Sequence, residues 1–225
     1  MEEQRVLIGI DYSTASLLAI ELLLEDAYDP SLYEEIAKAN VNRPEVLRLI
    51  LECPDTPDSV RKMVSDMMKV PDIPKEKIVK PRKPPEIREQ TIFQRIQKLS
   101  VSERIQLAIR GGKEIRSILL RDSNKEVALS VLDNPRITET EIEMIAKSRS
   151  VTDEALRIIT RKREWMKSYN IILALVNNPK TPVGIAMKLV PELRTRDLQI
   201  LEKNRNVAEG VRSNAKKILK ARKSL

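Results

Sequence analysis

Three stretches of this chain share a pattern in which a proline interrupts an apolar helical periodicity and a second helical stretch follows at once. The stretches align without a gap and comprise residues 45–68, 126–149 and 170–193. Their shared proline column consists of Pro54, Pro135 and Pro179. Proline has no N–H for the helical hydrogen bond, and it pushes the residue before it out of the α region. Each stretch is therefore expected to fold as a helix, a tight turn and a second helix.

The residues that follow the proline column have the character of helix starts. Thr56 and Thr181 each precede a further proline, which predicts a hydroxyl N-cap with proline at the first helical position. Thr138 instead has Glu141 three residues later, which is the spacing of a capping box. Near the N-terminus, Ser13 or Thr14 is expected to cap the helix that carries the apolar residues from position 17 onward.

A second, looser alignment covers the turns between such helix pairs. It comprises residues 36–46, 145–155 and 201–211, each of which reads as a helix end, a polar turn and a helix start. Each turn contains one aliphatic residue that we expect to point inward: Val41, Val151 or Val207.

The sequence around the proline column resembles bacterial HEAT-like proteins and the related leucine-rich-repeat variants. The resemblance is carried by V-x-NP-x-TP at residues 176–182 and a degenerate copy at 132–138, and it covers about residues 31–69 and 91–219. The two copies of the motif are 44 positions apart, and HEAT and armadillo repeats have periods of ~40–47 residues. The resemblance implies an all-α fold, an α-solenoid of HEAT/armadillo-like repeats with a small helical module at its N-terminus. Some leucine-rich-repeat variants carry a cysteine-ligated iron–sulfur cluster, but Cys53 is the only cysteine here, so no such cofactor is expected.

Charge divides the chain into three predicted parts. Residues 1–69 hold 7 Lys and Arg against 14 Asp and Glu, whereas residues 91–225 hold 28 against 15. Residues 70–90 between them are rich in proline and lysine and poor in apolar side chains, which is typical of an extended, semi-rigid linker. We therefore expect an acidic N-terminal helical module, a linker, and a basic HEAT-like repeat domain.

Composition also excludes several classes of function. The chain has no histidine, which removes Ser-His-Asp and Cys-His nucleophilic systems and nearly all zinc sites. Its carboxylates lie in helices of alternating charge, and no pair is indicated for acid–base catalysis. The expectation is a protein that is not an enzyme, with no catalytic residue, metal, cofactor or small-molecule substrate. No run approaches the ~20 apolar residues of a membrane span, and the first residues lack a signal-peptide pattern, so we expect a cytoplasmic protein.

One cluster of cations and aromatic residues is the best candidate for partner binding. It comprises Arg161, Lys162, Arg163, Trp165 and Lys167, with Tyr169 beside it. The cations are suited to phosphates or an acidic protein, and Trp165 to a base or a partner's pocket. The alternative is that Trp165 and Tyr169, spaced i and i+4, fill the interface between helix layers while the cations only keep the surface hydrated.

The sequence is therefore consistent with two functions. The first is a non-catalytic helical-repeat scaffold that mediates protein–protein interaction. The second is a nucleic-acid-binding HEAT-like protein that uses the basic C-terminal domain, although its cations are scattered and it has almost no aromatic residues for stacking.

Overall fold

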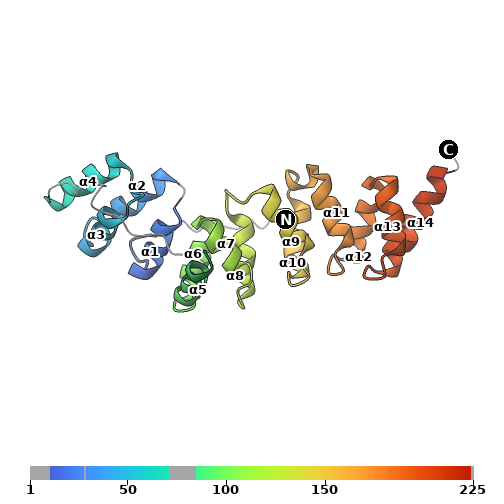
Figure 1. The fold of residues 1–225 in the computed structure, drawn as a ribbon, viewed down its shortest axis with the longest axis horizontal. Helices are drawn as coiled ribbons and strands as arrows, with labels where there is room; N and C mark the ends of the chain where they lie inside the picture. The colour runs from blue at the N-terminus through green and yellow to red at the C-terminus, as the bar shows by residue number, and fades with distance from the viewer. Residues whose placement is uncertain (1–10, 28, 71–84, 224–225) are drawn as a thin grey trace, which may run out of the picture. The chain divides into compact units, whose positions relative to one another are not determined.

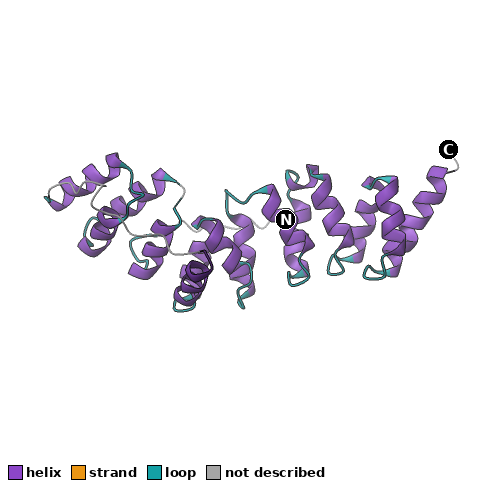
Figure 2. Ribbon diagram, in the orientation of Figure 1, coloured by secondary structure: helices purple, strands orange, loops and turns teal. Residues whose placement is uncertain are grey.

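The computed structural model describes residues 11–27, 29–70 and 85–223, and these residues form fourteen α-helices, three short 3-10 helices and no strand (Figure 1, Figure 2). The all-α prediction is thereby confirmed. Within the same residues, no helix is both long and apolar enough to cross a bilayer. The chain divides into two compact units, Met1–Pro135 and Arg136–Leu225.

The boundaries predicted from charge, at residues 1–69, 70–90 and 91–225, stay a prediction. Residues 71–84 of the predicted linker lie outside the described residues. The next helix begins at Pro85, six residues earlier than the sequence suggested. Proline is well tolerated in a first helical turn, because its fixed φ suits a helix and its missing N–H is not needed there.

The helices of the first unit do not pack in the order of the sequence. The unit contains α1 (Leu17–Glu25), α2 (Pro30–Ala39), α3 (Pro44–Glu52), α4 (Asp58–Met68), α5 (Pro85–Ile96), α6 (Val101–Arg110), α7 (Lys113–Leu119), α8 (Lys125–Ser130) and η2 (Val131–Asp133). Helix α1 packs on α3 and also on α5 and α6, while α4 packs on α2 and α3 (Figure 1). Helix α1 is therefore inserted between helices that follow it in the sequence, which a simple solenoid order does not anticipate.

Polar contacts hold both ends of α1 against α6 and α7. The Ser16 N–H donates to Glu103 Oε1 at 3.0 Å, and the Ile115 N–H in the first turn of α7 donates to Asp26 Oδ2 at 3.2 Å. A Cβ at Gly112 would lie 2.5 Å from Asp26, so only glycine allows this close approach.

Ion pairs and a capping box support the same interface. Arg95 of α5 pairs with Glu21 at 3.0 Å and with Glu25 at 2.7 Å, both on α1. Glu103 also completes a capping box with Ser100. Burial acts to raise the pKa of the Glu103 carboxyl, but the hydrogen bonds from Ser16 and Ser100 outweigh it and leave that pKa lowered.

The three prolines of the aligned column have the same local geometry. The residue before each one is Cys53, Asn134 or Asn178, and it ends a helix with φ of −76°, −67° or −83° and ψ of 121°, 122° or 120°. This extended conformation is the one that a following proline enforces. The prediction that each proline ends a helix is confirmed.

The prediction of threonine N-caps after the prolines is wrong. The N-cap residues are Pro57 and Pro182, and the two threonine hydroxyls instead donate back to the preceding helix, at 2.6 Å to the carbonyls of Ile50 and Leu175. Each of these carbonyls would normally accept from the N–H four residues later, which a proline lacks, so the hydroxyl replaces that bond. The capping box of Thr138 and Glu141 is present as predicted.

Two further local expectations are corrected by the structure. Val41 is 51% exposed, whereas Val151 and Val207 are buried as expected. Val41 stands one position early in its turn, so it does not reach the buried position that the other two occupy. Helix α1 is capped by Ser16, because Ser13 is already engaged in a turn with Asp11.

The second unit is built around three parallel helices of equal length. It contains α9 (Glu139–Lys147), α10 (Asp153–Arg161), η3 (Trp165–Lys167), α11 (Tyr169–Asn177), α12 (Val183–Leu189), η4 (Val190–Glu192), α13 (Thr195–Lys203) and α14 (Glu209–Lys223). Helices α9, α11 and α13 have nine residues each. Helix α9 packs on α11, and α14 packs on both α12 and α13 (Figure 1). The buried residues at equivalent positions of the three helices are Ile142, Ile172 and Leu198, then Ile145, Leu175 and Leu201.

Asparagine side chains join the C-terminal ends of these three helices. The buried Asn178 amide at the end of α11 donates to the carbonyls of Ala146 and Ser148, at 2.7 and 2.9 Å, at the end of α9. Asn204 at the end of α13 donates to the side chain of Asn177 at 3.1 Å. The three helix ends are therefore aligned, and equivalent residues of α9, α11 and α13 form rows across the unit.

Candidate functional site

The predicted cluster of cations lies at the connection between α10 and α11. Arg161 is the last residue of α10 and Lys162 is its C-cap, while η3 runs from Trp165 to Lys167. Arg161, Arg163 and Lys167 are exposed. The predicted residues are therefore together on one connection, with three cations exposed to solvent.

Trp165 in this cluster is covered by a neighbouring cation. The Lys162 Nζ lies 4.4 Å from the centre of the indole ring, which is within the range of a cation–π interaction. Trp165 is half-buried and does not belong to the fully buried core. Part of the indole is therefore accessible to a partner, and the other part packs against the protein.

Tyr169, the first residue of α11, has a structural connection to α13. Its hydroxyl donates to the Asp197 carboxylate and accepts the Arg194 N–H at 3.0 Å, and the Arg194 guanidinium lies 4.4 Å from the ring centre. Burial and the bond to Asp197 raise the pKa of the Tyr169 phenol, despite the opposing effect of Arg194. Tyr169 thus joins the starts of α11 and α13, as the asparagines join their ends.

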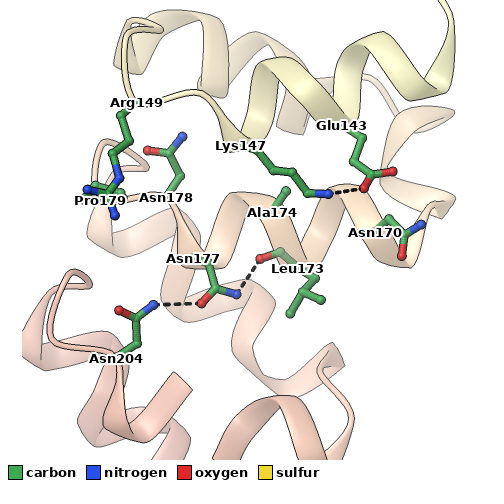
Figure 3. Close-up of a pocket in the computed structure, with 10 residues that line it drawn as sticks. All are labelled: Glu143, Lys147, Arg149, Asn170, Leu173, Ala174, Asn177, Asn178, Pro179 and Asn204. Atoms are coloured by element: carbon green, nitrogen blue, oxygen red, sulfur yellow. Dashed lines mark hydrogen bonds and ion pairs between the residues drawn. The ribbon is translucent and has the colours of Figure 1, made fainter. Parts of the chain in front are cut away.

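A hollow of about 400 Å³ lies on the outer side of α9, α11 and the end of α13 (Figure 3). Its lining residues are Glu143, Lys147, Arg149, Asn170, Leu173, Ala174, Asn177, Asn178, Pro179 and Asn204. Four of them, at positions 170, 173, 174 and 177, have the i, i+3, i+4, i+7 spacing of a single helix face.

The residue that lines the hollow in the middle of α11 is small, whereas its equivalents in α9 and α13 are large and do not line it. Ala174 is the sixth residue of α11, and the sixth residues of α9 and α13 are Met144 and Ile200. These two aliphatic side chains are 65% and 58% exposed, whereas Ala174 is buried. The helix register therefore gives a row of large, small and large apolar residues. We call the surface formed by this row and its neighbouring cations the α9–α11–α13 face.

The cations of this face occur at equivalent positions beyond the apolar row. Lys147 and Lys203 are the last residues of α9 and α13, and Arg149 and Arg205 follow the respective cap residues. Lys147 pairs with Glu143 at 2.5 Å, and both line the hollow (Figure 3). The other three cations are exposed and have no carboxylate partner among the described residues. Three exposed cations therefore lie at the C-terminal end of this face.

The asparagines that line the hollow have mainly a structural role. Asn178 uses both amide hydrogens on α9, and Asn177 donates to Leu173 O at 2.8 Å while accepting from Asn204 (Figure 3). Asn170 is exposed and has no hydrogen-bond partner among the described residues. The described residues also contain no group of cysteine and carboxylate side chains placed to hold a metal ion. What the face offers a ligand is therefore apolar contact, exposed cations and the amide group of Asn170.

Sequence reasoning missed the α9–α11–α13 face, although the sequence contains a signal for it. In α9 the buried face is complete with Ile142, Ile145 and Ala146, so Met144 is an extra apolar residue outside it. Ile200 is likewise extra beside the buried Leu198 and Leu201. Only the register between the helices, which the sequence does not specify, shows that the two extra residues belong to one row.

Comparison of this chain with protein-family models, with curated proteins and with solved structures finds no match.

Proposed function

We propose that this protein is a non-catalytic helical-repeat scaffold that binds another protein through the α9–α11–α13 face. The observation that carries the proposal is the exposure of Met144 and Ile200, which stand in α9 and α13 at the positions equivalent to Ala174 in the hollow. Contiguous exposed aliphatic surfaces rimmed by polar residues mark interaction sites, because water contact with them is unfavourable. Nothing in the fold of unit 2 requires these two side chains to be apolar, since both lie outside the buried rows.

The solenoid arrangement of HEAT-like repeats belongs to the same proposal. It is supported by the shared backbone geometry at Cys53, Asn134 and Asn178, and by the side-chain bonds that leave these residues for an adjacent helix. Asn134 donates to Ala108 O at 2.9 Å and Gly111 O at 3.0 Å at the end of α6, as Asn178 does to the end of α9. A recurrent helix-end contact of this kind is what stacked repeats need in order to keep their register.

The cluster at Arg161, Lys162, Arg163, Trp165 and Lys167 is proposed as a second partner contact. It lies at the start of α11, whereas the Asn178 end of the hollow lies at the other end of that helix. Nucleic-acid binding is the alternative function, favoured by the excess of cations in residues 91–225. Phosphate contacts would make such binding weaken steeply as salt rises.

Affinity capture with matched variants tests the proposed function. The full-length chain is used as bait in lysate of its native host, beside Met144→Glu/Ile200→Glu, the triple reversal of Arg161, Arg163 and Lys167 to Glu, and Met187→Glu. Met187 is 39% exposed on α12 and serves as the control. The proposal expects one or more proteins to be captured by the wild type and by Met187→Glu but not by Met144→Glu/Ile200→Glu.

Two results would count against the proposal. If all variants capture the same proteins as the wild type, neither surface is the binding site. If the purified chain shifts labelled duplex or single-stranded nucleic acid at ~50 mM salt, and the triple reversal abolishes the shift, the alternative function is favoured.

A further inference from the structure

We infer that the α9–α11–α13 face binds a short acidic segment of a partner protein in extended conformation, with one apolar side chain inserted over Ala174. The inference rests on the proposed function and specifies the chemistry of the partner. It is argued from the size of the apolar row, from the charge around it and from the kinds of residue it lacks.

The apolar row extends further than a small ligand would. Helix α9 packs on α11, and hydrogen bonds of Tyr169 and Asn204 join α11 to α13; with helix spacings of 8–10 Å, Met144 and Ile200 are roughly 16–20 Å apart. An extended peptide rises about 3.3 Å per residue, so five or six residues span the row. Leu173 and Ala174 of α11 line the hollow, so a residue near the middle of such a segment would insert there.

The charge of the face selects an acidic segment. Arg149, Lys203 and Arg205 have no carboxylate partner among the described residues, and the one carboxylate in the hollow, Glu143, is already paired with Lys147. Acidic residues on either side of the inserted side chain would meet these cations. Complementary charge of this kind steers encounter and disfavours basic segments.

The aliphatic centre favours a protein over a nucleic acid. Single-stranded nucleic acids are held by aromatic stacking on a cationic groove, and the described residues of the α9–α11–α13 face include no aromatic side chain. Met144, Leu173 and Ile200 present aliphatic surface, which suits Leu, Ile, Met or Phe of a peptide. Methionine in particular adapts its shape to different apolar partners.

Selection of peptides on the full-length protein tests the inference. A phage-displayed library of random twelve-residue peptides is first depleted on Met144→Glu/Ile200→Glu and then selected on the wild type. We expect the enriched peptides to carry net negative charge and to share one or two apolar residues flanked by Asp or Glu. Enrichment of neutral or basic peptides, or no enrichment over the depleted library, would overturn the inference.

Binding of an enriched peptide is then measured by fluorescence anisotropy with the full-length variants. Met144→Glu and Ile200→Glu should each weaken binding by at least roughly ten-fold, as expected for a central apolar contact. Arg149→Glu/Arg205→Glu should weaken it and reduce its dependence on salt. Met187→Glu should bind as the wild type does. Equal binding by all four variants would show that the peptide occupies another surface, which contradicts the inference.

The two proposals fail in different ways. If a host protein is captured through the α9–α11–α13 face but the selected peptides are not acidic, the proposed function stands and the inference about the partner is wrong. If single-stranded DNA displaces the peptide and binds equally to Met144→Glu/Ile200→Glu and the wild type, the cations alone act in binding and both proposals are contradicted.

Discussion

Removing the side chain of Asn178 should destabilise the second unit more than any other change of an asparagine on the hollow. The Asn178 amide donates two hydrogen bonds, to Ala146 O and Ser148 O, and its oxygen accepts the Lys180 N–H at 3.0 Å. Asn178 is 4% exposed, so water cannot readily replace these bonds. The substitution Asn178→Ala therefore leaves carbonyls at the end of α9 without a partner.

The size of the effect follows from the number of bonds. A protein hydrogen bond contributes about 0.5–1.5 kcal/mol net, so the loss of three predicts a decrease of about 1.5–4.5 kcal/mol in the free energy of unfolding. That is a large share of the ~5–15 kcal/mol that stabilises a typical domain. Asn170→Ala is the matched control: this asparagine is exposed in the same hollow and has no hydrogen-bond partner among the described residues, so a change within ~0.5 kcal/mol is expected.

Urea denaturation followed by circular dichroism at 222 nm measures both variants, and amide hydrogen exchange locates the effect. Protection should fall in α9 and α11 of Asn178→Ala, since these are the helices that the side chain joins. A free energy of unfolding for Asn178→Ala within 0.5 kcal/mol of that for Asn170→Ala would refute the idea that asparagine bonds fix the helix register.

Three further predictions concern the contacts of α1 and the single tryptophan. Gly112→Ala should lower the free energy of unfolding by about 1–3 kcal/mol, because the new Cβ collides with Asp26, and a thermal melt equal to the wild type's would contradict this. The pKa of Glu103 is lowered from 4.5, so its bonds stabilise the fold above pH 4.5, and this contribution is lost as the pH falls through the folded pKa. Urea midpoints from pH 7 to pH 3 should therefore fall less in Glu103→Gln than in the wild type, and equal falls would count against the predicted role. Lys162→Ala should raise acrylamide quenching of Trp165 fluorescence, because it uncovers the indole face, whereas unchanged quenching would show that Lys162 does not cover the ring in solution.

The positions of the helix breaks could be predicted from the sequence because they depend on local chemistry. Proline removes one particular hydrogen bond and restricts one particular neighbour, so the column of Pro54, Pro135 and Pro179 predicts helix ends without knowledge of the fold. The same local reasoning identified the capping box at Thr138. It failed at Thr56 and Thr181, because a hydroxyl near a helix break can hydrogen-bond to either helix. The carbonyls of the preceding helix lack their usual N–H donor, since a proline stands at that position, and the hydroxyls bond to them instead.

The contacts between helices could not be predicted in the same way. Nothing in the sequence around Gly112 indicates that Asp26, far away in the chain, approaches it. The position of α1 among later helices depends on contacts of this kind. The charge pattern also did not indicate that three carboxylates of the predicted acidic module, Glu21, Glu25 and Asp26, contact α5 and α7. Likewise, Met144 and Ile200 become one surface only through the register of the nine-residue helices.

The central claim is that equivalent residues of α9, α11 and α13 form rows. The distance between α9 and α13 tests this claim most directly. Spin labels at Lys147→Cys and Lys203→Cys, in a chain with Cys53→Ser, would be measured by double electron–electron resonance. Because α9 packs on α11 and hydrogen bonds join α11 to α13, we expect two helix spacings of 8–10 Å between α9 and α13, and we predict a narrow distribution of label distances below about 30 Å. A broad distribution, or one centred above about 40 Å, would contradict an in-register row of three neighbouring helices.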